Sequence, residues 1–212
     1  MEKLKGLYAI TDEKLTPYKD GLIFEKVERA LRGGAKILQL RDKSNEDEFI
    51  FPYAIVLRKL CKNYGALFII NDRVELAKKV EADGVHLGEE DWSIEEARRI
   101  LGPNKIIGVS CYGDLERAKL MEKNSANYVA FGSFFISPTK PASKVIDKKI
   151  LIEAKKVLRI PICAIGGITA ERAKELVRLG ADLIAVVSDL WLARDIEKRA
   201  AEYQKIFEDF EV

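Results

Sequence analysis

Short apolar runs alternate with amphipathic segments along the chain. Eight runs have the composition of strands, at Gly6–Thr11, Lys36–Arg41, Ala66–Asn71, Gly84–Leu87, Lys105–Ser110, Tyr128–Phe131, Pro161–Ile165 and Leu183–Val187. Several of these runs are apolar without interruption, which is typical of strands buried on both faces of a parallel sheet. The intervening segments have helical spacing, as at Leu22–Arg32, Ile94–Leu101, Leu115–Lys123 and Arg172–Leu179, the last followed by Gly180 as a natural C-terminal cap.

This alternation predicts an α/β fold, a (β/α)8 TIM barrel formed by one domain over residues 1–212. The length of 212 residues suits such a barrel, since α/β barrels commonly form one domain of about 200–250 residues. The rival is an open doubly wound sheet. That fold usually carries a glycine-rich turn after its first strand, whereas the pair Gly166-Gly167 follows the seventh run. We therefore favour the barrel.

The composition of the chain argues against several classes of binding partner. The 36 basic and 34 acidic residues give a net charge of +2, without the basic tract that grips nucleic acid. No apolar run approaches the ~20 residues that span a bilayer, so no membrane partner is expected. The three cysteines (Cys61, Cys111 and Cys163) lie far apart, which favours a reducing cytoplasm over a disulfide framework. The only histidine, His86, excludes a mechanism with two histidines and is interpreted as a hydrogen-bonded core residue.

Functional side chains of a TIM barrel gather where strands end and βα loops begin. At the second strand, alternation places Gln39, Arg41 and Lys43 on one face and leaves Leu38 and Leu40 for the helical layer. Arginine offers a planar fork to phosphate oxygens and lysine a point charge, so the three polar residues predict an anion site. The alternative is a surface ion pair with a nearby carboxylate.

Aspartates follow the third and fourth strands. Neighbouring parallel strands lie about 5 Å apart, so their loops can bring Asp72 and Asp91 together. Two close carboxylates repel unless a cation lies between them or one is protonated. Mg²⁺ fits, because it takes one or two carboxylates together with water and phosphate oxygens. The alternative is that each aspartate caps the following helix.

Two later loops predict a second phosphate site. The segment after the sixth strand combines Ser137, Pro138, Thr139 and Lys140, and we interpret it as an anion-binding lid, with an ordinary surface loop as the alternative. Gly167 and Ser188 follow the seventh and eighth strands, where free backbone N–H groups of barrels commonly bind phosphate. The predicted mouth thus holds a cationic site and an uncharged one, as two phosphorylated small-molecule substrates would require.

These residues resemble the thiamine-phosphate synthase family along nearly the whole chain. The resemblance rests on short motifs in the same order, 7-LYAITD-12, 39-QLRDK-43, 70-INDR-73, 83-DGVHLG-88, 108-GVS-110, 137-SPTK-140, 164-AIGGI-168 and 185-AVVS-188. The family is a class of transferases in thiamine biosynthesis. It joins hydroxymethylpyrimidine diphosphate to thiazole phosphate, forming a C–N bond and releasing pyrophosphate.

The resemblance implies roles for individual residues. The pyrimidine diphosphate would be held by Gln39, Arg41, Lys43, Asn71, Ser110 and Lys140, and one Mg²⁺ by Asp72 and Asp91. The thiazole phosphate would be held by Ser137, Pro138, Thr139, Gly167, Val187 and Ser188. Arg41, Lys43 and Lys140 would be catalytic, because the family's reaction needs charge stabilisation of a departing diphosphate and aligned partners, without a protein nucleophile.

The chain departs from the family pattern at four places. Glu89 stands where Gln is usual, Tyr112 where His is usual, Ser137 at the first Thr of the lid motif, and Gly132-Ser133 at a Gly-Pro pair. Three alternatives stay open: thiazole tautomerase on the same barrel, another phosphate-binding barrel enzyme, and a barrel that binds ligands without turnover. Barrels of this kind often pair, so a homodimer is a further expectation.

Overall fold

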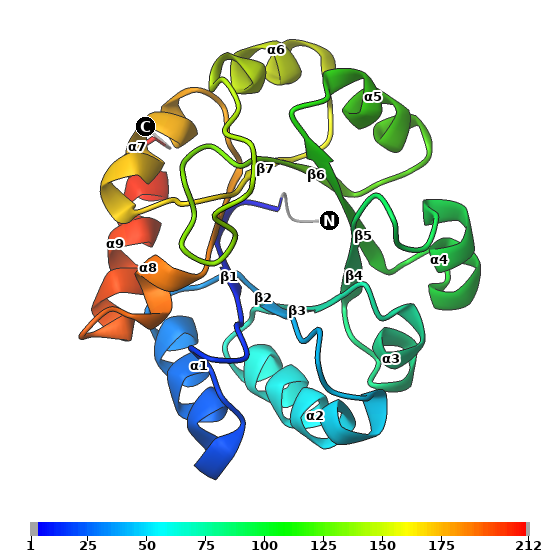
Figure 1. The fold of residues 1–212 in the computed structure, drawn as a ribbon, viewed down its shortest axis with the longest axis vertical. Helices are drawn as coiled ribbons and strands as arrows, with labels where there is room; N and C mark the ends of the chain where they lie inside the picture. The colour runs from blue at the N-terminus through cyan, green and yellow to red at the C-terminus, as the bar shows by residue number, and fades with distance from the viewer. Residues whose placement is uncertain (1–3, 211–212) are drawn as a thin grey trace.

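The computed structural model describes residues 4–210, which form a closed barrel (Figure 1). Its parallel strands follow one another in chain order, and the last pairs with the first. The strands are β1 (Gly6–Ile10), β2 (Ile37–Leu40), β3 (Leu67–Asn71), β4 (Gly84–Leu87), β5 (Ile106–Tyr112), β6 (Tyr128–Phe131), β7 (Ile162–Ala164) and β8 (Leu183–Val186). The predicted TIM barrel is therefore confirmed; residues 1–3 and 211–212 of the predicted domain lie outside the described residues.

Helices surround the barrel on the outside (Figure 1). They are α1 (Leu22–Arg32), α2 (Asp47–Asn63), α3 (Val74–Lys79), α4 (Ile94–Leu101), α5 (Leu115–Lys123), α6 (Lys149–Val157), α7 (Ala170–Arg178), α8 (Ser188–Trp191) and α9 (Ile196–Glu208), with a 3₁₀ turn at Lys19–Gly21. The helix predicted at Arg172 starts earlier, because the Thr169 hydroxyl accepts the Arg172 N–H and caps it there. It also ends at Arg178, before Gly180.

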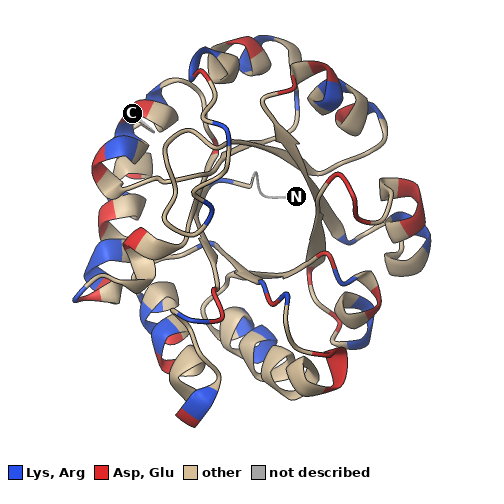
Figure 2. Ribbon diagram, in the orientation of Figure 1, with Lys and Arg blue, Asp and Glu red and all other residues tan. Residues whose placement is uncertain are grey.

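Two apolar layers explain why the strands read as continuous hydrophobic runs. One face of each strand packs on the helices, as Leu38 and Leu40 do. The other face fills the barrel interior, where Tyr8, Tyr128 and Ile69 are almost fully buried. Charged side chains lie on the helices and loops, and the strands are almost free of them (Figure 2). The carboxyl ends of the strands are thus left for polar chemistry.

Strand β5 runs further than predicted. It ends at Tyr112 instead of Ser110, and its pairing with β6 shifts register between these residues. Tyr112 has a φ of 55°, in the left-handed region that a non-glycine residue seldom adopts. Such an irregularity re-aims a side chain, and here it leaves both Ser110 and Tyr112 on the cavity described below.

Candidate functional site

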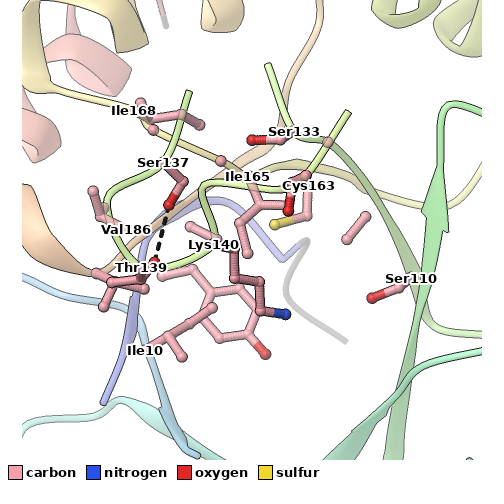
Figure 3. Close-up of a pocket in the computed structure, with 18 of the residues that line it drawn as sticks. Ile10, Ser110, Ser133, Ser137, Thr139, Lys140, Cys163, Ile165, Ile168 and Val186 are labelled. Atoms are coloured by element: carbon pink, nitrogen blue, oxygen red, sulfur yellow. Dashed lines mark hydrogen bonds between the residues drawn. The ribbon is translucent and has the colours of Figure 1, made fainter. Parts of the chain in front are cut away.

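A cavity of about 560 Å³ opens at the carboxyl ends of the strands (Figure 3). Most of the predicted site residues line it, namely Gln39, Arg41, Asn71, Ser110, Ser137, Thr139, Lys140, Gly167, Val187 and Ser188. The predicted residues Lys43, Asp72, Asp91 and Pro138 lie outside its wall. A single hollow therefore gathers residues that are up to 149 positions apart in the sequence, from Gln39 to Ser188.

Three cations define what we term the cationic side of the cavity: Arg41, Lys43 and Lys140. Lys140 extends from the loop after β6 across the opening (Figure 3). Its burial, together with the charges of Arg41 and Lys43, lowers the pKa of Lys140. Neighbouring cations repel one another, and an anion bound among them would relieve that repulsion.

Lys43 and Asp72 form an ion pair on this side. The Lys43 side chain is exposed and Asp72 is largely covered. The alternative interpretation of Lys43 as an ion-paired residue therefore describes part of its surroundings. Asp72 itself has a φ of 55°, and the Asn71 side chain donates a hydrogen bond of 3.2 Å to its carboxylate.

The two predicted metal ligands follow neighbouring strands, Asp72 after β3 and Asp91 after β4. The Asp72 N–H donates to the His86 carbonyl at 2.8 Å, and the Asp91 carboxylate accepts the Gly88 N–H at 2.6 Å. Neither side chain caps the helix that follows it: Ser93 caps α4 and Arg73 precedes α3. Within residues 4–210, His, Cys, Asp and Glu form no group of three or more that could hold a metal. Two carboxylates fit a hard cation that completes its shell with ligand oxygens and water.

A second group of lining residues, which we term the glycine side, contains Ser137, Thr139, Gly167 and Ser188. The hydroxyls of Ser137 and Thr139 are 2.9 Å apart and face the cavity from the loop after β6 (Figure 3). Gly167 has a φ of 61°, and a Cβ there would overlap the backbone carbonyl of Ile136. Glycine is therefore required both by its own backbone and by the close approach of this loop.

Phe135 anchors the loop after β6. Its N–H donates to the Gly166 carbonyl at 3.0 Å, and the Ser133 hydroxyl donates to its carbonyl at 2.7 Å. Lys148 and Arg172 lie over its ring, 4.9 Å and 4.6 Å from the centroid. The base of the loop is thus fixed against β7, while Ile136 beyond it is 75% exposed.

The sequence analysis did not predict a network of buried hydrogen bonds in the cavity floor. Tyr8, Tyr128 and His86 join Gln39 and Ser110 in continuous side-chain hydrogen bonds. Burial lowers the pKa of His86 to about 4, so its imidazole is neutral at physiological pH. The signal available in the sequence was alternation, which directs Tyr8, Gln39 and Tyr128 into the barrel along with Ile10 and Ala130. His86 was correctly expected to be hydrogen-bonded.

Two of the residues that differ from the family pattern, Glu89 and Tyr112, contact each other. The Tyr112 hydroxyl accepts the Glu89 N–H at 3.2 Å, beside the Gly88 N–H that binds Asp91. Tyr112 is 45% exposed and lines the cavity. It therefore ties the end of β5 to the loop that carries Asp91.

Comparison with known proteins identifies the family to which this chain is similar. Residues 7–190 match the family described as thiamine monophosphate synthase. The thiamine-phosphate synthase of Nitrosococcus oceani is 47% identical over 204 residues, which cover 96% of this chain and 93% of that protein. That of Wolinella succinogenes is 49% identical over 189 residues, covering 89% and 86%.

A solved structure gives the same result in three dimensions. The thiamine phosphate pyrophosphorylase of Pyrococcus furiosus superimposes with a TM-score of 0.87 at 41% identity. The match covers 97% of this chain and 96% of the other. The barrel, its length and the order of its loops are therefore shared with that protein.

Proposed function

The chain belongs to the thiamine monophosphate synthase family, and we propose that it joins a pyrimidine diphosphate to a thiazole phosphate at the mouth of its barrel. The products are thiamine phosphate and pyrophosphate, and the reaction makes the protein a transferase that forms a C–N bond. The observation that carries this proposal is the single cavity whose lining combines the cations Arg41 and Lys140 with glycine and hydroxyl groups.

The cationic side would hold the diphosphate. Arg41 and Lys140 line the cavity, and their repulsion falls when the negative oxygens of a diphosphate come between them. Lys43 would join them by giving up part of its contact with Asp72. Gln39, Asn71 and Ser110 line the same cavity, where they would hydrogen-bond the pyrimidine.

Asp72 and Asp91 would hold Mg²⁺ at the rim. When bound, the ion would neutralise charge on the diphosphate, as divalent cations do in other phosphoryl and diphosphate sites. The two carboxylates follow the adjacent strands β3 and β4, and the contacts of Asp91 and Asp72 with Gly88 and Asn71 orient them. This support comes from the chemistry of the donor set, and the metal is part of the proposal.

The glycine side would hold the thiazole phosphate. Backbone N–H groups near Gly167 and Ser188, with the hydroxyls of Ser137 and Thr139, offer hydrogen bonds without positive side-chain charge. Val187 lines the same wall, and Pro138 shapes the loop between the two hydroxyl residues. An uncharged site leaves the diphosphate on the cationic side as the better-stabilised leaving group.

The chain's own residues then have three tasks. Arg41, Lys43 and Lys140 stabilise the charge that grows on pyrophosphate as the C–O bond breaks. The two walls hold the thiazole nitrogen in line with the electron-poor carbon. Ile10, Ile165 and Val187 present apolar surface to the cavity and keep water from that carbon. No side chain has to act as a nucleophile.

Purified protein with both substrates tests the proposal. We expect thiamine phosphate and pyrophosphate in equal amounts, with turnover that requires Mg²⁺ and stops when it is chelated. Thiazole rearrangement without pyrophosphate would instead identify a tautomerase. Binding of both substrates without product would identify a ligand-binding barrel. Either result would refute the proposal.

Location and assembly are separate proposals. The three cysteines are buried free thiols, as a reducing cytoplasm allows. No helix within residues 4–210 is both long and apolar enough to cross a membrane. A homodimer stays a prediction, which sedimentation at two protein concentrations would test.

A further inference from the structure

Five side chains form an unbroken hydrogen-bond relay beneath the cavity: Gln39, Tyr8, Tyr128, His86 and Ser110. The Gln39 amide nitrogen lies 2.7 Å from the Tyr8 hydroxyl, which lies 2.7 Å from that of Tyr128. The Tyr128 hydroxyl is 2.8 Å from His86 Nδ1, and His86 Nε2 is 2.8 Å from the Ser110 hydroxyl. The relay joins two predicted substrate-binding residues through three residues to which the proposed reaction gives no role.

With the Gln39 amide nitrogen facing Tyr8, counting protons fixes the direction of every other bond in this relay. The Gln39 amide donates to the Tyr8 oxygen, so the single Tyr8 proton is free for Tyr128. Tyr128 has accepted a proton and in turn donates its own to His86 Nδ1. His86 must then carry its proton on Nε2 and donate it to Ser110.

The other arrangement leaves a proton without an acceptor. If Tyr128 donated to Tyr8, the Tyr8 oxygen would accept from both its partners and its own buried proton would bind nothing. Tyr8 is 1% exposed and Tyr128 is fully buried, so such a loss would be costly. A charged imidazolium fails in the same way, because Tyr128 would accept from both Tyr8 and His86 Nδ1 and its own buried proton would have no acceptor.

We propose that Tyr8 and Tyr128 are positioning residues, which hold His86 as the neutral Nε2–H tautomer and so turn the Ser110 hydroxyl outward as a hydrogen-bond donor. Ser110 lines the cavity, and once its oxygen accepts the Nε2 proton its own proton is directed to the cavity. Resting on the proposed function, this inference assigns Ser110 to an acceptor atom of the pyrimidine diphosphate. A glycine is required beneath it, because a Cβ at Gly108 would overlap the Tyr128 ring.

The tautomer can be measured without turnover. His86 is the only histidine, so its two ¹⁵N resonances need no assignment among several residues. We expect the uniformly labelled protein to show a protonated Nε2 and an unprotonated Nδ1 at neutral pH. An Nδ1–H tautomer or an imidazolium would overturn the inference, whether or not the protein makes thiamine phosphate.

A change at the far end of the relay should reverse it. Gln39→Glu replaces a donor by a carboxylate of similar size, so Tyr8 would donate to residue 39, Tyr128 to Tyr8 and His86 to Tyr128. We expect His86 to switch to the Nδ1–H tautomer at mildly alkaline pH. In a Tyr128→Phe background the same change should have no effect, because the relay is broken. An unchanged tautomer in Gln39→Glu, or a switch that persists without Tyr128, would overturn the proposal.

Kinetics and a control complete the test. Tyr128→Phe should raise the KM for the pyrimidine diphosphate by about 3–10-fold, the value of one hydrogen bond, and leave that for the thiazole phosphate unchanged. Tyr203→Phe removes an equally buried hydroxyl, which bonds Asp189 at 2.6 Å outside the relay. It should leave the His86 resonances unchanged. Equal effects of the two variants on His86 would indicate loss of packing alone and contradict the inference.

Discussion

The cationic side and the glycine side of the cavity are held in place by different forces. Lys43 is paired with Asp72, and Lys140 reaches inward from the loop after β6, so charge positions the cationic side. Gly167, by contrast, is fixed by its left-handed backbone and by the close approach of Ile136. Charges can rearrange around a leaving group, whereas a backbone site keeps its shape. This difference suits a reaction in which one anion departs and the other stays.

Loss of the proposed metal ligands should produce the largest effect. Asp72→Asn or Asp91→Asn removes a negative oxygen donor at the rim, and we expect kcat/KM to fall by ~100-fold or more with the fold intact. Magnesium titration of the rate measures this, and circular dichroism checks the fold. The exposed residue Asp209 provides the control Asp209→Asn. Near-native activity in either rim variant would remove the metal from the cationic side.

A side chain at Gly167 should damage the other wall. In Gly167→Val the Cβ would overlap the Ile136 carbonyl at a φ of 61°, and we expect the KM for the thiazole phosphate to rise by ~100-fold. Gly65→Val is a matched control, because Gly65 has a φ of 67° and open space around it. Full activity of Gly167→Val would show that the glycine side is not a backbone site.

Lys140 should separate the two walls kinetically. Lys140→Ala removes one charged hydrogen-bond donor from the cationic side, so the KM for the pyrimidine diphosphate should rise by ~10–100-fold. The thiazole phosphate should bind as before in direct titration. Lys149→Ala, at an exposed position on α6, is the control. An effect confined to the thiazole phosphate would mean that the loop after β6 serves the glycine side alone.

Low pH should destabilise the folded protein through His86, which lies in the cavity floor. The pKa of His86 is about 4 in the folded protein and about 6.5 when unfolded, so below pH 6.5 the unfolded chain binds the proton first. Stability should therefore fall by roughly 2–3 kcal/mol between pH 6.5 and 4, modulated by the facing charges of Asp91 and Lys140. Urea unfolding of the protein and of His86→Gln measures this difference. An identical pH dependence in both would contradict a buried neutral imidazole.

The sequence predicted the barrel well because each strand carries its own signal. Leu183–Val186 and Tyr128–Phe131 are short apolar runs between helical patterns. This alternation is enough to predict the fold without knowledge of the tertiary contacts. The residues at the rim could be predicted equally well, because functional side chains of a barrel lie at the carboxyl ends of its strands, as Arg41 and Ser110 do.

Contacts between distant strands could not be predicted in the same way. Tyr8 and Tyr128 look like ordinary apolar strand residues until the closed barrel brings their hydroxyls together. The pairing of Lys43 with Asp72 depends on side-chain conformations in two loops. The extension of β5 to Tyr112 accompanies a register shift, which the hydrophobic periodicity of the sequence does not predict.

The aromatic side chains in the floor of the cavity have a further consequence for substrate entry and product release. Tyr8 and Tyr128 are buried and fill the barrel interior beneath the cavity, so the cavity does not continue through the barrel. Reactants and products would then enter and leave at the carboxyl ends of the strands. A molecule bound nearer the opening would block the exit of one bound beneath it, so the order of binding would set the order of release.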